Sequence, residues 1–80
     1  MRVIRELSFH HSKVTFFAWN NRYLVKFEQG FLEQTFKINQ SDVQDEDSLV
    51  RMIDNEFVLQ VERLFMEMAK SLAEAKGRVA

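Results

Sequence analysis

Residues 13–28 read KVTFFAWNNRYLVKFE, and this stretch decides the fold. On both sides of Asn20-Asn21, β-branched and aromatic residues alternate with other side chains, as in two half-buried strands. Asparagine tolerates the left-handed backbone that a two-residue hairpin turn requires. The stretch therefore predicts an antiparallel β-hairpin in which Phe16 lies opposite Val25.

The same alternation occurs before and after this hairpin. Gln29-Gly30 is a second turn signal, because glycine supplies positive φ, and residues 10–12 form a third turn. We therefore predict a four-stranded antiparallel meander, ββββ, with strands over residues 3–9, 13–19, 22–28 and 31–38.

The predicted turns define a register that can be checked against the side chains. Every predicted pair on one face is apolar: Phe9–Val14, Leu7–Phe16, Ala18–Tyr23, Phe16–Val25, Val14–Phe27, Phe27–Leu32 and Tyr23–Phe36. On the other face, Lys26 is predicted to lie opposite Glu33 and Lys13 opposite Glu28, both favourable cross-strand pairs.

After residue 40 the apolar period changes to three and four residues, which is typical of an amphipathic helix. Ser41 and Gln44 suggest a capping box, and Gly77 a C-terminal stop. A continuous helix over 47–76 would be about 45 Å long. We therefore expect a break near Asp54-Asn55, with Asp54 capping the second piece.

The expected fold class is thus α+β: a meander over residues 1–40 and a helical segment over 41–77, in one domain spanning 1–80. The helix is expected to pack on one face of the sheet, one side of it covering the apolar strand residues. The predicted core places Phe16, Tyr23, Val25, Phe27 and Phe36 under Phe57, Val61, Leu64, Phe65 and Met68.

Two groups of apolar residues are left over by this core. One lies on the far side of the helix, where Met52, Leu59 and Met66 recur at seven-residue spacing. The other lies on the outer face of the sheet, with Ile4 placed opposite Trp19. Apolar patches of this kind usually mark a binding surface. We therefore predict a homodimer or larger oligomer with this candidate interface: Ile4, Phe17, Trp19, Leu24, Met52, Leu59 and Met66.

Composition excludes several chemistries. The 80 residues contain no cysteine, which removes thiolate catalysis, disulfides and cysteine zinc sites. The start of the chain, MRVIRELSF, has no continuous apolar region of the kind found in secretory signals, and no stretch is long enough to span a membrane. A cytoplasmic protein is expected.

We find no constellation of catalytic residues and predict that the protein is not an enzyme and holds no cofactor or metal. His10-His11 lacks a third ligand, and the acidic run from Asp42 to Asp47 lacks the central glycine of a calcium loop. Glu62 lies inside the apolar side of the helix, where it is either a strained carboxylate whose charged form is disfavoured by burial or, far more often, a residue at the rim or paired with a basic residue across an interface.

Binding of single-stranded nucleic acid is the alternative function. Residues 1–41 carry six Lys/Arg and three Glu, a balance of +3, whereas residues 42–80 carry five Lys/Arg and nine Asp/Glu, a balance of −4. The candidate nucleic-acid face comprises Phe17, Trp19, Arg22 and Lys26, with Arg2, Lys13 and Lys37 nearby; aromatic platforms flanked by basic residues are how sheets hold single strands. The order ββββα also resembles, in topology alone, the repeat of PUR-type single-strand-binding proteins, whose repeats pair through their helices.

Overall fold

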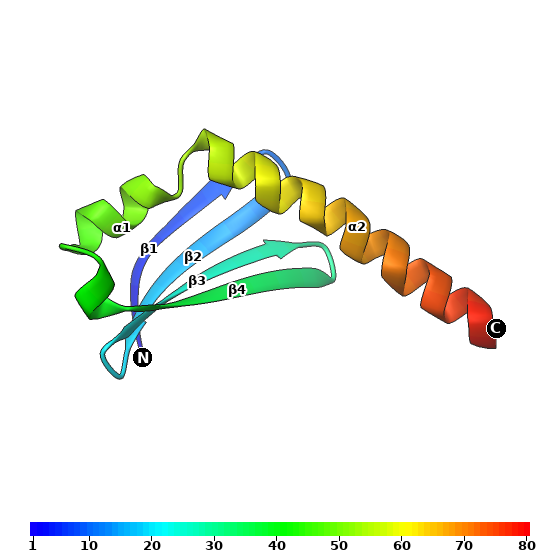
Figure 1. The fold of residues 1–80 in the computed structure, drawn as a ribbon, viewed down its shortest axis with the longest axis horizontal. Coiled ribbons are helices and arrows are strands. Elements are labelled where there is room, and N and C mark those ends of the chain that lie inside the picture. The colour runs from blue at the N-terminus through cyan, green and yellow to red at the C-terminus, as the bar shows by residue number, and fades with distance from the viewer.

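The computed structural model describes all residues 1–80 and confirms the predicted α+β fold. Four antiparallel strands lie side by side in chain order: β1 (Arg2–Phe9), β2 (Ser12–Trp19), β3 (Arg22–Gln29) and β4 (Leu32–Asn39). A 3₁₀ turn, η1 (Gln40–Asp42), leads to the helices α1 (Glu46–Met52) and α2 (Asn55–Val79). Both helices cover the same face of the sheet, here called the inner face (Figure 1).

The central hairpin forms as predicted. Asn20 and Asn21 have φ of 51° and 61°, the left-handed values that the two-residue turn needs. Phe16 lies opposite Val25, and the predicted pairs Ala18–Tyr23, Val14–Phe27 and Lys13–Glu28 are also present.

The predicted register of β4 is wrong by two residues. The turn consists of Gly30 and Phe31, with φ of 60° at Gly30, so Gln29 lies opposite Leu32. Phe36 therefore faces Val25 and not Tyr23, and Leu32 does not face Phe27. A slip of two residues keeps each side chain on its own face, so the predicted faces of β4 are correct.

The opposite face shows the same displacement. Lys26 is paired with Thr35 and not with Glu33. The lysine Nζ nevertheless lies 3.9 Å from Glu33 Oε2, because diagonal neighbours on a sheet are within reach of long side chains. The predicted attraction is therefore present across a diagonal.

The register of β1 is also wrong, for two reasons. The turn to β2 is His10-His11, so Phe9 lies opposite Ser12 and Leu7 opposite Val14. A bulge between Val3 and Arg5 then inserts Ile4 as an extra residue.

The bulge changes where the first residues of β1 lie. Ile4 packs against the core and does not lie opposite Trp19 as predicted. Arg2 pairs with Ala18, on the inner face, and reaches Glu46 of α1, so it does not belong to the outer basic face.

The helical segment is broken at the predicted place. Asp54 precedes α2, and its Oδ1 accepts a hydrogen bond from the Phe57 N–H at 2.9 Å. The predicted capping box of Ser41 and Gln44 is wrong, because residues 40–42 form η1. Asp45 caps α1 instead, accepting from the Ser48 N–H at 2.8 Å.

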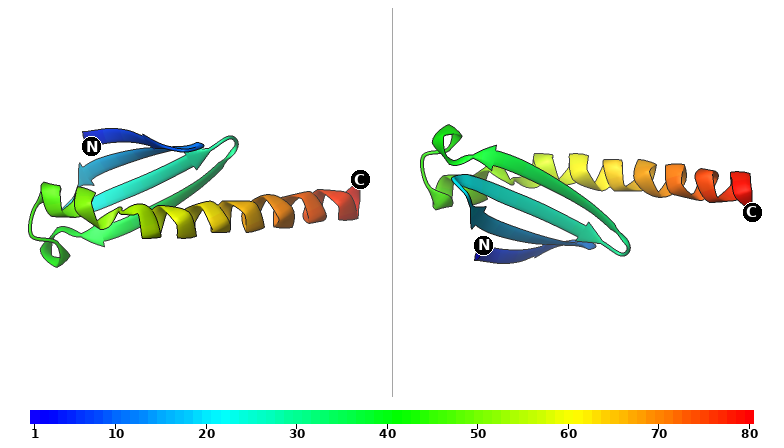
Figure 2. Two further views of the ribbon diagram at one scale, coloured as in Figure 1. Left: turned by 90° about the horizontal axis from the view of Figure 1, so that it is seen from above. Right: turned by 90° about the horizontal axis from the view of Figure 1, so that it is seen from below.

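Gly77 does not end α2, which runs on to Val79. The predicted C-terminal stop is therefore wrong. Seen from above and below, α2 starts over β4 and leaves the sheet on the β4 side, and its C-terminal half runs on past the sheet (Figure 2).

The core lies between the inner face and the helices. Its largest buried side chains are Phe16, Phe27, Phe65, Leu49, Val14, Val25, Val58 and Val61. Phe36, Phe57 and Met68 pack against it and are partly buried. Leu64, which was predicted to be buried, is 46% exposed. Its neighbour Phe65 is buried against the sheet as predicted. Because adjacent helix residues point about 100° apart, the two side chains cannot both face the sheet directly.

Candidate interaction surfaces

The solvent side of the helices carries three of the predicted interface residues. Leu59 and Met66 lie on one side of α2 and are exposed, Met66 at 74%. Met52 is also exposed but belongs to α1, on the other side of the break capped by Asp54. The seven-residue spacing therefore continues within α2 but does not form one helical stripe with Met52.

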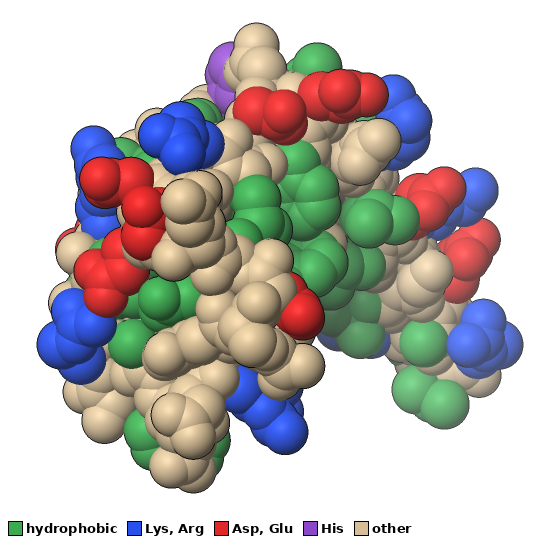
Figure 3. All heavy atoms as spheres, turned by 60° about the vertical axis from the view of Figure 1, so that its left-hand side comes forward, with side chains coloured by type: hydrophobic (Ala, Val, Ile, Leu, Met, Phe, Trp, Pro, Cys, Tyr) green, Lys and Arg blue, Asp and Glu red, His purple; other side chains and the backbone are tan.

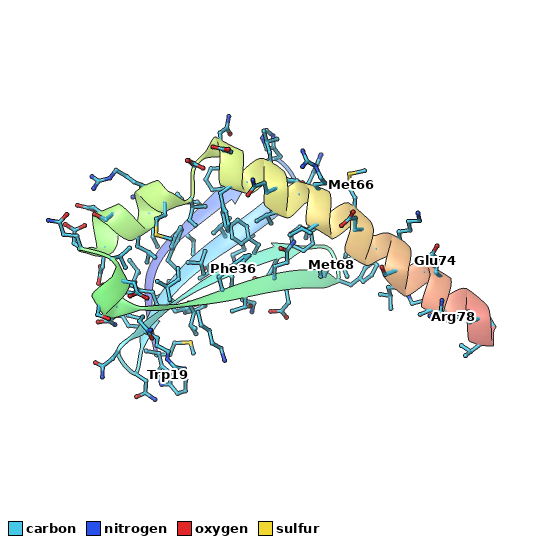
Figure 4. The ribbon with its side chains drawn as sticks, in the orientation of Figure 1. Trp19, Phe36, Met66, Met68, Glu74 and Arg78 are labelled. Atoms are coloured by element: carbon cyan, nitrogen blue, oxygen red, sulfur yellow. The ribbon has the colours of Figure 1, made fainter.

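The outer face of the sheet carries three others. Phe17 and Leu24 lie opposite each other on β2 and β3 and are partly buried. Trp19, at the end of β2, is 50% exposed and lies opposite Arg22. Figure 4 places Trp19 at the β2–β3 turn, far from the C-terminal end of α2.

The charges of the outer face are partly neutralised. Lys26 Nζ lies 3.9 Å from a carboxylate oxygen of Glu28 and of Glu33. Lys13 Nζ lies 3.6 Å from Glu6 Oε1. Within the candidate nucleic-acid face, Arg22 beside Trp19 has no such carboxylate contact, so that corner is the least neutralised part.

Sequence reasoning missed a third surface, on the β4 side of α2. Phe36 of β4 meets Phe57 at the start of α2, with ring centroids 5.2 Å apart. Leu64 follows Phe57 by seven residues, two helical turns, and so lies on the same side of the helix. Figure 3 shows hydrophobic side chains gathered in a recess of the surface.

On the β4 side, the inner-face residues of β4 and several residues of α2 are only partly covered, and we call this group the β4-side recess. Its members are Leu32, Phe36 and Ile38 from β4 and Phe57, Leu64 and Met68 from α2. Leu64 is exposed because of the way α2 is rotated about its own axis. The apolar period of the sequence does not specify that rotation to within one residue. The apolar layer between helix and sheet therefore continues to the surface along β4.

Polar groups near the core serve structural roles. Ser12, buried on β2, has its hydroxyl 3.4 Å from both Gln29 Oε1 and Glu62 Oε1 and can donate its single proton to either, so the Glu62 carboxylate lies at the rim of the core. Hydrogen bonds from Ser48 lower the pKa of Asp45. The hydrogen bond from Arg2 to Glu46 raises the pKa of Arg2. This ion pair links β1 to α1.

No group of three or more His, Asp or Glu side chains is placed to hold a metal ion. None of the helices has the length and apolarity to cross a membrane. No family model, curated protein or solved structure matches the chain.

Proposed function

We propose that the protein is a non-catalytic cytoplasmic interaction module that acts by associating with a second copy of itself. The open apolar layer on the β4 side carries this proposal. There Phe36 and Phe57 are only partly covered, and Leu64 is 46% exposed beside them.

The small size of the core supports the same conclusion. Of 80 residues, 12 are buried, and ten of these are hydrophobic. Domains of this size are often completed by oligomerisation. Burying a leucine side chain contributes about 1.5–3 kcal/mol, so covering Leu64 and its neighbours would add substantially to a marginal stability.

Sedimentation equilibrium over a wide concentration range tests self-association. We expect a mass that rises from monomer toward dimer. Two variants separate the surfaces: Leu64→Glu on the β4 side, and Leu59→Glu combined with Met66→Glu on the solvent side of α2. We expect Leu64→Glu to weaken association more than the double variant, and a monomeric mass at every concentration would refute the proposal.

Nucleic-acid binding is the second candidate, favoured by the exposed pair of Trp19 and Arg22. The contacts of Lys26 with Glu28 and Glu33 speak against it, since a phosphate would have to displace them. Trp19 is the only tryptophan. Quenching of its fluorescence by a mixed-sequence oligonucleotide, saturable and abolished by salt, would favour this candidate instead.

A further inference from the structure

The two edges of the sheet differ in how well they resist pairing with another strand. β1 is interrupted by the bulge at Ile4, a common device that protects an edge. β4 is regular over its eight residues and contains neither a bulge nor a proline. Its outer edge is not paired with any strand.

The backbone of β4 directs a defined set of groups to that edge. The Gln40 N–H donates to the Asn21 carbonyl at 3.1 Å. In an antiparallel ladder such bonds fall on every second residue. The even-numbered residues of β4 therefore bond to β3, and Glu33, Thr35 and Lys37 direct their N–H and C=O groups outward.

We propose that β4 pairs antiparallel with β4 of a second copy, about a two-fold axis at Thr35, to join two four-stranded sheets into one. This inference rests on the proposed self-association and names its interface. In this register, Glu33 of each copy lies opposite Lys37 of the other, and Thr35 lies opposite Thr35. Opposite charges and threonine pairs at directly opposed positions are favourable.

Neighbouring registers lack this complementarity. With Gln34 or Phe36 on the axis, neither Glu33 nor Lys37 meets an opposite charge. A shift of two residues from Thr35 places Glu33 opposite Glu33, or Lys37 opposite Lys37, and like charges in these positions are destabilising. The charge pattern of β4 thus selects one register.

The side chains on the inner face of β4 are also compatible with this register. The same register sets Leu32 opposite Ile38 and Gln34 opposite Phe36 of the second copy. These added side chains would lie beside the β4-side recess, against Leu64. Because α2 leaves the sheet on the β4 side (Figure 2), the two-fold axis would place the two α2 helices next to each other on the inner face of the joined sheet.

Charge reversal tests the register. We expect Lys37→Glu to weaken the dimer by at least roughly tenfold, because two symmetric pairs become repulsive. Glu33→Lys should act likewise, and Glu33→Lys combined with Lys37→Glu should restore association to within a few-fold. Circular dichroism of each variant checks that the monomer fold is kept. Lys37 takes part in none of the ion pairs within the chain, whereas Glu33→Lys also removes the contact of Glu33 with Lys26.

Single cysteines test the axis directly, because the protein has none of its own. Opposed residues that exchange hydrogen bonds have Cα atoms about 5.5 Å apart, a separation that a disulfide spans. Thr35→Cys should therefore form a cross-linked dimer under mild oxidation. Ser8→Cys, exposed on the protected β1 edge, is the matched control and should cross-link far more slowly.

The outcomes distinguish the two proposals. A monomeric wild-type protein overturns both. A dimer that tolerates Lys37→Glu, or that cross-links no faster through Thr35→Cys than through Ser8→Cys, overturns the β4 interface and leaves self-association through another surface. Rescue by the double charge reversal together with selective cross-linking at Thr35 establishes the register.

Discussion

The two halves of α2 carry the same apolar repeat but meet different surroundings. Val58, Val61 and Phe65 are fully buried against the sheet, with Phe65 only 2% exposed. Leu72 continues their three- and four-residue spacing and is 36% exposed, and Val79 is more exposed still. Figure 4 shows the reason: past Met68 the helix leaves the strands, and Glu74 and Arg78 lie on a part that projects beyond them.

The contacts that hold each half differ accordingly. The first half has the Asp54 cap, the aromatic contact of Phe57 with Phe36, and a hydrogen bond of 3.0 Å from Gln34 Nε2 to the Val61 carbonyl. In the second half, Met68 packs against the core, and farther along Lys76 Nζ lies 5.3 Å from the centre of the Phe31 ring at the end of the sheet. Stability is thus concentrated in one half of a continuous helix.

The largest expected effect is the loss of a buried side chain from the first half. Phe65→Ala should lower the free energy of unfolding by about 3–5 kcal/mol, because it removes packing and leaves a cavity. Leu72→Ala, seven residues later on the same side, should lower it by about 1 kcal/mol or less. Urea unfolding measures both, and equal losses would show that the two halves are packed alike.

A smaller effect is expected at the start of α2. Asp54→Ala removes the side chain that accepts from the Phe57 N–H and should cost about 1 kcal/mol. Asp54→Asn keeps an acceptor of similar quality and serves as the control. If both variants unfold at the wild-type urea midpoint, the cap makes no net contribution to stability and the first half depends on packing alone.

The smallest effect on global unfolding is expected in the projecting half. A Cβ added at Gly77 would meet no atom within 4 Å, and the residue lies inside the helix. Gly77→Ala should favour the helix locally by about 0.5–1 kcal/mol.

We therefore expect slower amide exchange around residue 77, with a melting temperature that changes by no more than about 2 °C. A large rise in melting temperature would mean that the projecting half unfolds together with the core. The two halves of α2 would then not differ in stability.

The sheet shows which part of a register can be read from sequence. At Asn20-Asn21 both turn residues favour positive φ, so the hairpin has one good solution and the prediction was confirmed. At Gly30 the single glycine suits more than one turn, and the structure places it first and not second in the turn. Local chemistry therefore left a two-residue ambiguity, which does not change the face on which a side chain lies.

The candidate surfaces divide in a similar way. Alternation and helical period were enough to place Trp19, Leu59 and Met66 at the surface. They did not predict the position of Ile4. A bulge has no reliable signal in the sequence of one strand and is defined only by how that strand pairs with its neighbour. Nor did they identify the β4-side recess, which depends on how α2 is rotated and on which strand it lies over.

The sequence by itself determined the order of elements, the inner and outer faces of β2, β3 and β4 and the break at Asp54, because turn chemistry, side-chain period and caps act over a few neighbouring residues. Only the tertiary structure decided which apolar residues are covered. Leu64 and Phe65 are adjacent and both apolar, yet one is almost half exposed and the other buried, because burial depends on the surface that a distant strand presents to each. The alignment of Glu33 and Lys37 is already present in the sequence of β4, but their edge is open only because the fold places β4 last in the sheet.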